Sequence, residues 1–582
     1  MGASTIAAAP AGQSTSQGLG ADAVPLRAQA RVWLSVAMLF VVVRALPILS
    51  LPPGRDQSTY LLIGRSLLEG KQLYRDLWDN KPPGIFCLYA GISKLFGSAV
   101  WGVALVDIAW LLVISYCIFR FTARFLGPGA ATVAVAVHAS WHARVKYSYI
   151  HIAQPETFQL LCLFAGFFLM QRRGRRWRKA GCLTAGLLLG YAFWLKYNAV
   201  AFVPFLLFLP YLDTSSLNRE PRRVALTISW RDWLGRTALL GAGFGVMIAG
   251  VLAWIVLGGA WPAMKQIQFE VLPRYAAMGV ESRAHYWTAV AMRTTFFLGV
   301  WTEVATVVAL VMAWRGRDLA RSAPVFVATA IAYLATVMQV RLHSYYFQTC
   351  FPFLAMIWGY LVLKAFETCR RLAHWCKARE WKLAPILVWV LFGNLIFWPL
   401  PAEFDSLSID YESLAEWRRD PWSFYAEFPE PIYLEHLKGQ LETVRYLKQN
   451  LRPGEGIFLW GAHCLIYYLS GSRPPTRFVS NLALVSTWSP PSWREELVRD
   501  LEHSPPRFIV VARGDELPSI TYTELDSERY LRVFPRLDGF ISSHYSLVAD
   551  FDSFVIYQRA MAGSTSQSED SDTRAQLETS PN

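Results

Sequence analysis

The sequence predicts a polytopic α-helical membrane protein with about eleven transmembrane helices and an α/β C-terminal domain outside the membrane. Of the 582 residues, 54% are hydrophobic and only 17% are charged, well below the ~25% typical of soluble domains. Long apolar runs recur until about residue 400 and then stop. Basic residues cluster in short loops between these runs, as the positive-inside rule requires of cytoplasmic loops.

Composition also excludes several classes of protein. The net charge of +13 does not indicate nucleic-acid binding, because the basic residues follow the loops that membrane topology explains. The eight cysteines are scattered, and none forms a CxxC or a Cys/His zinc spacing. We therefore expect neither a disulfide framework nor a structural zinc site.

The predicted spans follow from the apolar runs and their charged flanks. Arg27 and Arg31 precede the first span, about 32–51, and place the N-terminus in the cytoplasm. The segment QRRGRRWRK, at 171–179, is the strongest cytoplasmic marker in the chain. The remaining ten spans are expected at about 99–119, 130–140, 157–170, 180–194, a sixth ending near 212, 237–257, an eighth ending before WRGRD, 323–340, 351–364 and 383–400.

These patterns divide the chain into four segments. Residues 1–30 are predicted to be a disordered cytoplasmic tail, followed by an uncleaved first span. Residues 31–400 form the transmembrane domain, and residues 401–560 form an extracytoplasmic α/β domain of one unit. Within that domain HLKGQLETVRYLKQN predicts an amphipathic helix, GIFLWG and PPRFIVVARGD predict buried strands, and FVIYQR predicts a closing edge strand. Residues 561–582 are a low-complexity tail.

The first outer loop carries the most informative residues. Its sequence at 55–83, RDQSTYLLIGRSLLEGKQLYRDLWDNKPP, is too polar for lipid and includes a helix-like section that we expect to lie along the membrane. It holds Asp56, Asp76, Asp79 and Lys81. A carboxylate at the mouth of a membrane helix is costly without a partner or a function. We therefore predict that Asp56 is a catalytic base, with Asp76 and Asp79 in support.

Further polar residues gather in the later outer loops. The loop between the third and fourth spans gives His142, Arg144, Lys146, His151, Gln154 and Glu156, and later corners give Lys196, Tyr197, Arg274, Arg341, His343, Tyr345 and Tyr346. Together they predict a cavity with carboxylates for an acceptor and with cations for a phosphate, whose oxygens lysine and arginine bind. A carboxylate there could deprotonate an acceptor hydroxyl, and direct displacement at a sugar carbon would invert its configuration.

The order of the first-loop residues resembles that of GT-C glycosyltransferases. The matching positions are Asp56, Tyr60, Gly70, Tyr74, Arg75-Asp76, Lys81-Pro82-Pro83 and Phe96-Gly97. The sequence is most similar to the dolichyl-phosphate-mannose–protein mannosyltransferase and aminoarabinose transferase branch, with its bacterial relatives. The likeness covers about 44–208, and the HxYY sequence at 343–346, the number of spans and the outer C-terminal domain are also similar.

The resemblance implies an inverting membrane glycosyltransferase of the cell inner membrane. It would transfer a sugar from a polyprenyl-phosphate donor to a hydroxyl of a protein, lipid or glycan at the outer face. The resemblance gives Asp56 the catalytic role and makes Glu156 the family's second acid. The positions that would hold the lipid phosphate or shape the cavity are Lys81, Lys196, Arg341, His343, Tyr345 and Tyr346.

The sequence departs from the family pattern at two places. Arg55 and Gln57 flank Asp56 where many relatives have two adjacent acids, and Asn80 stands where the aminoarabinose branch has an acid. These departures leave the sugar and any need for a metal open. No cofactor is assigned; a divalent metal could be held by His151 and Glu156, although their spacing is not typical of a metal site.

Purely structural roles would also account for the same residues. Asp56 would then cap a helix, Asp76 and Asp79 would be turn residues, and the two tyrosines would be membrane anchors. The whole chain could then be a transporter or flippase of lipid-linked substrates, or an envelope scaffold without activity. Against the transporter, the sequence shows no internal repeat and places its acids at loops rather than mid-membrane.

Overall fold

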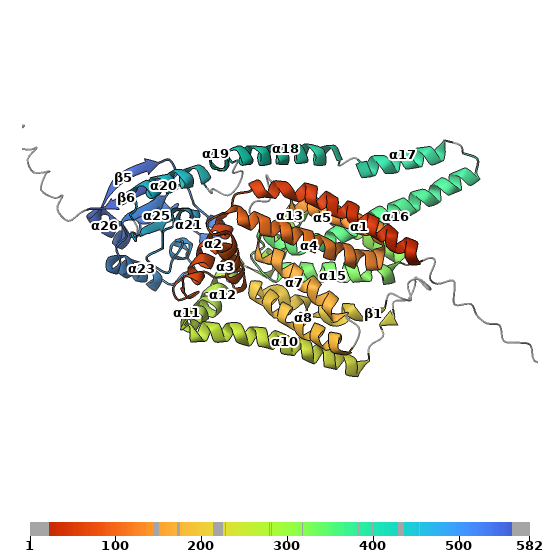
Figure 1. Cartoon of the computed structure of the whole chain (residues 1–582), viewed down its shortest axis with the longest axis horizontal. Helices are drawn as coiled ribbons and strands as arrows, with labels where there is room; N and C mark the ends of the chain where they lie inside the picture. The colour runs from red at the N-terminus through yellow and green to blue at the C-terminus, as the bar shows by residue number, and fades with distance from the viewer. Residues whose placement is uncertain are drawn as a thin grey trace, which may run out of the picture.

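The computed structural model combines a bundle of long helices with a small mixed sheet at one end of the bundle (Figure 1). It describes residues 23–143, 151–171, 175–213, 225–226, 229–278, 280, 282–316, 318–381, 383–397, 400–428, 436–452 and 454–560. The predicted C-terminal tail, most of the predicted N-terminal tail, and both Arg144 and Lys146 lie outside the described residues.

Helices occupy each region in which a membrane span is predicted. They are α1 (Ala23–Ala45), α4 (Trp101–Leu126), α5 (Pro128–His142), α7 (Pro155–Met170), α8 (Arg175–Leu195), η2 (Tyr197–Phe202) with α9 (Val203–Phe208) and η3 (Leu209–Tyr211), α10 (Trp230–Leu257), α13 (Arg283–Leu298) with α14 (Val300–Arg315), α15 (Leu319–Val337), α16 (Phe351–Ala378) and α17 (Ala384–Phe397). A two-residue ladder, β1 (Leu212–Asp213) with β2 (Ala225–Leu226), lies between α9 and α10.

Only some of these helices are long and apolar enough to cross a membrane alone. Within the described ranges four helices qualify, at Ala28–Ser50, Trp101–Leu126, Trp230–Leu257 and Phe351–Ala378, and α13 with α14 would add a fifth if the pair is one span. That pair bends by 95° next to Gly299, whose φ of +78° L side chains rarely adopt. The helical class and the membrane character of the chain stand, whereas the count of eleven crossings remains a prediction.

Close helix packing in the bundle depends on small residues. A Cβ placed on Gly186 of α8 would overlap the carbonyl of Leu240 in α10, and one on Gly243 of α10 would overlap the carbonyl of Leu183 in α8. Because membrane helices gain little from the hydrophobic effect between themselves, close backbone approach at small residues is a main source of their association. Substitution of either glycine would push α8 and α10 apart.

Several shorter elements complete the fold. They are η1 (Leu46–Ser50), α2 (Arg55–Leu68), α3 (Gly84–Phe96), α11 (Trp261–Lys265), the π-helical η5 (Gln266–Val271), α12 (Leu272–Ala277) and η6 (Ser344–Thr349). Figure 1 shows α2, α3, α11 and α12 between the bundle and the sheet. Helix α2 corresponds to the section expected to lie along the membrane, and it ends just before Gly70, which has a φ of +87°. A Cβ on Gly64 of α2 would overlap the backbone of Ala90 in α3, so the two helices pack tightly.

The sheet has four strands in the order β3-β4-β6-β5. Strands β3 (Ile457–Trp460) and β4 (Phe508–Ala512) are parallel, and β6 (Phe554–Arg559) pairs antiparallel with β4 and with β5 (Tyr545–Phe551). The flanking helices are α20 (Leu437–Asn450), α21 (Leu465–Ser470), α22 (Leu482–Val485), α23 (Ser492–His503), α24 (Pro518–Thr521), α25 (Ser527–Arg532) and α26 (Pro535–His544).

The prediction that FVIYQR is an edge strand is wrong. Strand β6 lies inside the sheet, whose two edges are β3 and β5, and the sequence did not reveal β5. Most of β5 is exposed, with only Tyr545 buried, so its sequence lacks the alternation of apolar and polar residues by which a half-buried strand is recognised. A register shift between Leu547 and Ala549 also interrupts its pairing.

A long helix precedes the sheet, in the stretch after residue 400 where the long apolar runs stop. Helix α18 (Leu400–Arg419) runs along the outside of the bundle (Figure 1) and is followed by α19 (Pro421–Ala426). The buried Arg44 of α1 forms an ion pair of 2.9 Å with Asp410 of α18, and Arg44 also donates to the carbonyl of Ala143. Such a buried pair stabilises only while both partners are present, so α18 is fixed to the helical bundle.

Candidate active site

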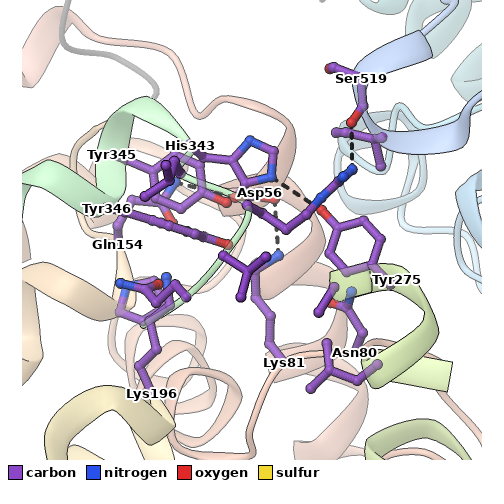
Figure 2. Close-up of a pocket in the computed structure, with 18 of the residues that line it drawn as sticks. Asp56, Asn80, Lys81, Gln154, Lys196, Tyr275, His343, Tyr345, Tyr346 and Ser519 are labelled. Atoms are coloured by element: carbon purple, nitrogen blue, oxygen red, sulfur yellow. Dashed lines mark hydrogen bonds and ion pairs between the residues drawn. The ribbon is translucent and has the colours of Figure 1, made fainter. Parts of the chain in front are cut away.

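A cavity of about 1050 Å³ lies where the bundle meets the sheet region. Its walls come from the start of α2, the 78–82 loop, the start of α7, the corner between α8 and η2, α12, α13, the segment that leads into η6, and parts of the C-terminal region. The predicted site residues that line it are Asp56, Asp79, Lys81, Lys196, Arg341, His343, Tyr345 and Tyr346. Figure 2 shows the labelled members of this set converging on Asp56.

Asp56 and Lys81 form an ion pair at the centre of this cavity. Asp56 is the second residue of α2, where the helix dipole favours a negative charge. Its Oδ1 accepts a hydrogen bond of 3.2 Å from Nζ of Lys81, and both side chains stay partly accessible, at 29% and 23%. The lysine ammonium also lies 5.2 Å from the ring centroid of Tyr60. Asp56 is therefore held in place while remaining open to a ligand.

The pair determines the charge of both groups. Burial alone would raise the pKa of Asp56, but the charge and hydrogen bond of Lys81 outweigh it and hold that pKa below its usual value. Burial alone would lower the pKa of Lys81, but the carboxylates of Asp56 and Asp79 hold that pKa above its usual value. At neutral pH the site therefore contains a carboxylate and an ammonium.

Glu156 lies behind the cavity wall rather than on it. Its side chain is completely buried in the first turn of α7, and its Oε1 accepts from Nζ of Lys196. Lys196 does line the cavity, where its ammonium stands 3.3 Å from the ring centroid of Tyr346 and 5.5 Å from that of Tyr345. Lys196 thus reaches the cavity with its charge partly compensated by a buried carboxylate.

The HxYY segment forms an aromatic wall beside this lysine. The rings of His343 and Tyr345 are stacked with centroids 5.8 Å apart, and Tyr346 meets both of them edge-on. Nε2 of His343 is 3.1 Å from the hydroxyl of Tyr275. Burial, assisted by Arg341 and Lys196, lowers the pKa of His343 to about 3. His343 is therefore neutral at physiological pH and acts as a hydrogen-bonding group, not as a cation.

Arg341 makes more contacts with the rest of the protein than a side chain that only binds phosphate would need. Its guanidinium donates to the carbonyls of Met278 (2.8 Å) and Ser519 (2.6 Å) and to the hydroxyl of Tyr522, and it lies 4.5 Å from the ring centroid of Tyr275. These groups belong to α12 and to the region of α24. Arg341 therefore joins the HxYY wall to the C-terminal region across the edge of the cavity.

Replacement of Arg341 by lysine should loosen this junction, because one ammonium cannot reproduce the planar fork of the guanidinium. We expect the free energy needed to detach the C-terminal region from the bundle to fall by about 2 kcal/mol, which is the contribution of one hydrogen bond to a charged group. Limited proteolysis of the membrane-bound protein measures this. Arg283→Lys, on the exposed start of α13, is the matched control; equal proteolysis of both variants would contradict the assignment.

The remaining predicted residues lie in different surroundings. Asp79 lines the cavity, and its Oδ1 accepts a hydrogen bond of 2.8 Å from the backbone N–H of Lys81. It therefore helps to fix the conformation of the 78–82 loop. Asp76 binds Arg75 and the N–H of Gln72 instead, as a turn residue does. Nε2 of His151 lies 3.2 Å from the hydroxyl of Ser344. Among the described residues no three His, Cys, Asp or Glu side chains form a group able to hold a metal ion.

The sequence suggested that the C-terminal domain helps to bind the acceptor, but it did not indicate which residues of that region line the cavity. Two of the lining residues from that region, Trp488 and Tyr522, are aromatic. The full set is Ala462, Val479, Ser480, Leu482, Trp488, Leu517, Ser519, Ile520 and Tyr522. The ring of Trp488 stacks on that of Trp78 in the 78–82 loop, with ring centroids 6.5 Å apart, and its centroid lies 5.2 Å from that of Tyr275. Nothing in the local sequence around Trp488 indicates this contact with a loop near the start of the chain.

The helical bundle with a sheet at one end is similar in fold to GT-C glycosyltransferases of known structure. Residues 80–229, about a quarter of the chain, match the family model described as dolichyl-phosphate-mannose-protein mannosyltransferase. The resemblance predicted from the first loop is thereby confirmed.

Solved structures of similar proteins agree with this class. ArnT from Cupriavidus metallidurans bound to undecaprenyl phosphate has a TM-score of 0.52 and 12% identity, with 92% of this chain and 98% of that chain covered. The apo form of the same ArnT has a TM-score of 0.52 and 13% identity, with 89% and 97% covered.

More distantly, the oligosaccharyltransferase from Archaeoglobus fulgidus tethered with an acceptor peptide has a TM-score of 0.48 and 12% identity, with 91% of this chain and 74% of that chain covered. No protein of curated function matches the sequence.

Proposed function

We propose that this protein is an inverting membrane glycosyltransferase that moves a sugar from a polyprenyl-phosphate donor to a hydroxyl acceptor. The single observation that carries the proposal is the ionised Asp56, paired with Lys81 and open to a cavity lined by further cations. The GT-C fold supports it, and so does the ArnT structure, which contains undecaprenyl phosphate. The cavity, which we assign to the outer face of the cell membrane, has room for a sugar and the reacting part of an acceptor.

In this proposal the cations bind the donor phosphate. Lys81 and Lys196 reach the cavity from two sides, and Figure 2 shows both pointing into it. Phosphate oxygens attract ammonium groups strongly in surroundings of low dielectric constant. The leaving group is a phosphate that carries its own charge, so stabilisation of that charge by the lysines replaces protonation by a general acid.

Asp56 is the proposed general base. Its carboxylate takes the proton of the acceptor hydroxyl as the oxygen attacks the anomeric carbon, and the bond from that carbon to the phosphate oxygen breaks. A single displacement of this kind inverts the configuration at the anomeric carbon. The acceptor approaches from the side walled by the C-terminal region, whose lining residues carry no charged side chain.

A direct test uses membranes that contain the protein and a set of polyprenyl phosphates, each bearing a different labelled sugar. Transfer of label to protein, lipid or glycan, with release of polyprenyl phosphate and an inverted anomeric centre, is the expected result. A product of retained configuration would contradict the single displacement. Movement of intact labelled donor across the membrane without transfer would identify a flippase instead.

Replacement of Lys81 by methionine should weaken donor binding. We expect the KM for the donor to rise about tenfold or more, the cost of losing one charge-assisted contact to phosphate. Because Lys81 holds the pKa of Asp56 down, the acidic limb of the pH profile of kcat/KM should also move to higher pH. Lys71→Met, on an exposed position of the same loop, is the control and should change neither quantity.

A further inference from the structure

The four residues before α7 are held by an unusual number of side-chain contacts. Three consecutive carbonyls of this segment, residues 151–154, each accept a hydrogen bond from a different part of the fold. His151 O accepts from Gln348 Nε2 (2.8 Å), Ile152 O from Gln57 Nε2 (2.8 Å), and Ala153 O from the Tyr89 hydroxyl (3.0 Å). These donors come from η6, α2 and α3, so the segment is fixed from three directions.

A buried carboxylate fixes the same segment from a fourth direction. Asp107 of α4 accepts the backbone N–H of Ala153 at 2.7 Å through Oδ1, and its Oδ2 lies 2.7 Å from Nε2 of His142. Ala153 has a φ of +50°, a conformation that is costly for a residue other than glycine and persists only where the surroundings enforce it. The fold therefore maintains one particular backbone path through residue 153.

That path directs the side chain of Gln154 at Asp56. Its Nε2 lies 3.5 Å from Oδ2 of Asp56, and its Oε1 accepts from the hydroxyl of Tyr60 at 3.2 Å. An ionised carboxylate only accepts hydrogen bonds, so the amide nitrogen must face Asp56 and the amide oxygen must face Tyr60. Figure 2 shows Gln154 beside Asp56, on the side away from Tyr275.

The two carboxylate oxygens of Asp56 thus have different hydrogen-bond partners, and the proposed reaction affects these two hydrogen bonds differently. Oδ1 is bonded to Lys81, a flexible cation that the proposed function also assigns to the donor phosphate. When the phosphate arrives, it competes with Asp56 for the ammonium of Lys81. The neutral amide of Gln154 has no such competing charge, and its backbone is fixed.

We propose that Gln154 is a positioning residue, which holds the Asp56 carboxylate in its reactive orientation when Lys81 turns to the donor phosphate. This inference rests on the proposed glycosyl transfer. The distance of 3.5 Å between Gln154 Nε2 and Asp56 Oδ2 is at the long end for a hydrogen bond, and catalytic hydrogen bonds in ligand-free enzymes commonly shorten when substrate binds.

The test compares Gln154→Leu with the wild-type protein in the labelled-donor assay. We expect kcat to fall about tenfold or more, as for loss of one hydrogen bond to a charged group, with the KM for the donor changed less than about threefold. The amide stabilises the carboxylate form of Asp56, so its removal raises the pKa of Asp56 and moves the acidic limb of the kcat profile to higher pH.

The charged or titratable groups around Asp56 remain in place in this variant. They are Arg55, Tyr60, Asp79, Lys81, Tyr89, Lys196, His343, Tyr345 and Tyr346. The control is Gln449→Leu, the same chemical change at an exposed position of α20, which should leave kcat and the pH profile unchanged. A second variant, Gln154→Glu, keeps the size and shape of the side chain. It should move the acidic limb further, because a second carboxylate beside Asp56 raises its pKa.

A double variant separates positioning from packing. Tyr60→Phe removes only the hydroxyl that orients the amide and keeps the ring beneath Lys81. We expect it to lower kcat in the wild-type background and to have no further effect in Gln154→Leu, because the two groups act in one chain. Two results would overturn the inference. One is an additive loss of kcat in the double variant with the acidic limb of the pH profile at its wild-type position. The other is a wild-type kcat in Gln154→Leu. Absence of transfer by the wild-type protein would instead contradict the proposed function.

Discussion

Asp56→Asn should reduce transfer by at least about a hundredfold, the lower bound of what a general base contributes. Asparagine has nearly the shape of aspartate but cannot accept the proton of the acceptor hydroxyl. It also no longer neutralises Lys81, which becomes free to bind the donor phosphate. We therefore expect the affinity for polyprenyl phosphate to stay the same or to increase while kcat falls steeply. A binding assay measures the affinity, and transfer of label measures kcat.

This combination of results distinguishes catalysis from structure. If Asp56 only stabilised the start of α2, loss of the residue would lower the thermal stability of the protein and weaken donor binding together. Asp76→Asn is the matched control, because Asp76 binds Arg75 and Gln72 outside the cavity lining. Full activity of Asp56→Asn would end the assignment of Asp56 as the base.

Lys196→Met should strongly destabilise the protein as well as impair donor binding. Glu156 is completely buried and has Lys196 as its ion-pair partner. Removal of one member of a buried pair leaves an uncompensated charge and typically costs about 3–5 kcal/mol. We expect a lower melting temperature, measured on the purified protein in detergent.

The double variant Lys196→Met with Glu156→Gln tests that explanation. With both charges removed, most of the lost stability should return, because the buried carboxylate no longer lacks a partner. Donor binding should not return, because the ammonium beside Tyr346 is still missing. A double variant as unstable as the single one would show that Lys196 stabilises the protein through its packing on Tyr346 instead.

Much of this architecture could be predicted from the sequence because membrane insertion leaves strong local signals. Apolar runs and basic loops located many helix ends closely, as at the end of α10 and the start of α16. The aromatic and charged residues of the first loop likewise indicated Asp56 and Lys81, since ionisable groups at the membrane boundary need a function or a partner. The structure places these two side chains in direct contact, although their catalytic roles remain predictions.

What the sequence could not reveal depends on contacts between distant segments. The pairing of Glu156 with Lys196 and the role of Arg341 as a junction both follow from the fold, not from spacing in the chain. The helix α18 was hidden because its many charged and polar residues resemble a loop, while contacts such as Arg44 with Asp410 stabilise it. Tertiary contacts override local preference in such elements.

The wall contributed by Trp488, Ser519 and Tyr522 has a consequence for biosynthesis. During translation Asp56, at the start of α2, and Lys81, in the 78–82 loop, are synthesised long before these later residues. Because these three residues line the cavity around Asp56, that part of its wall is missing until they are made. A chain that ends before residue 488 is therefore expected to lack the enclosed site that the proposed transfer requires.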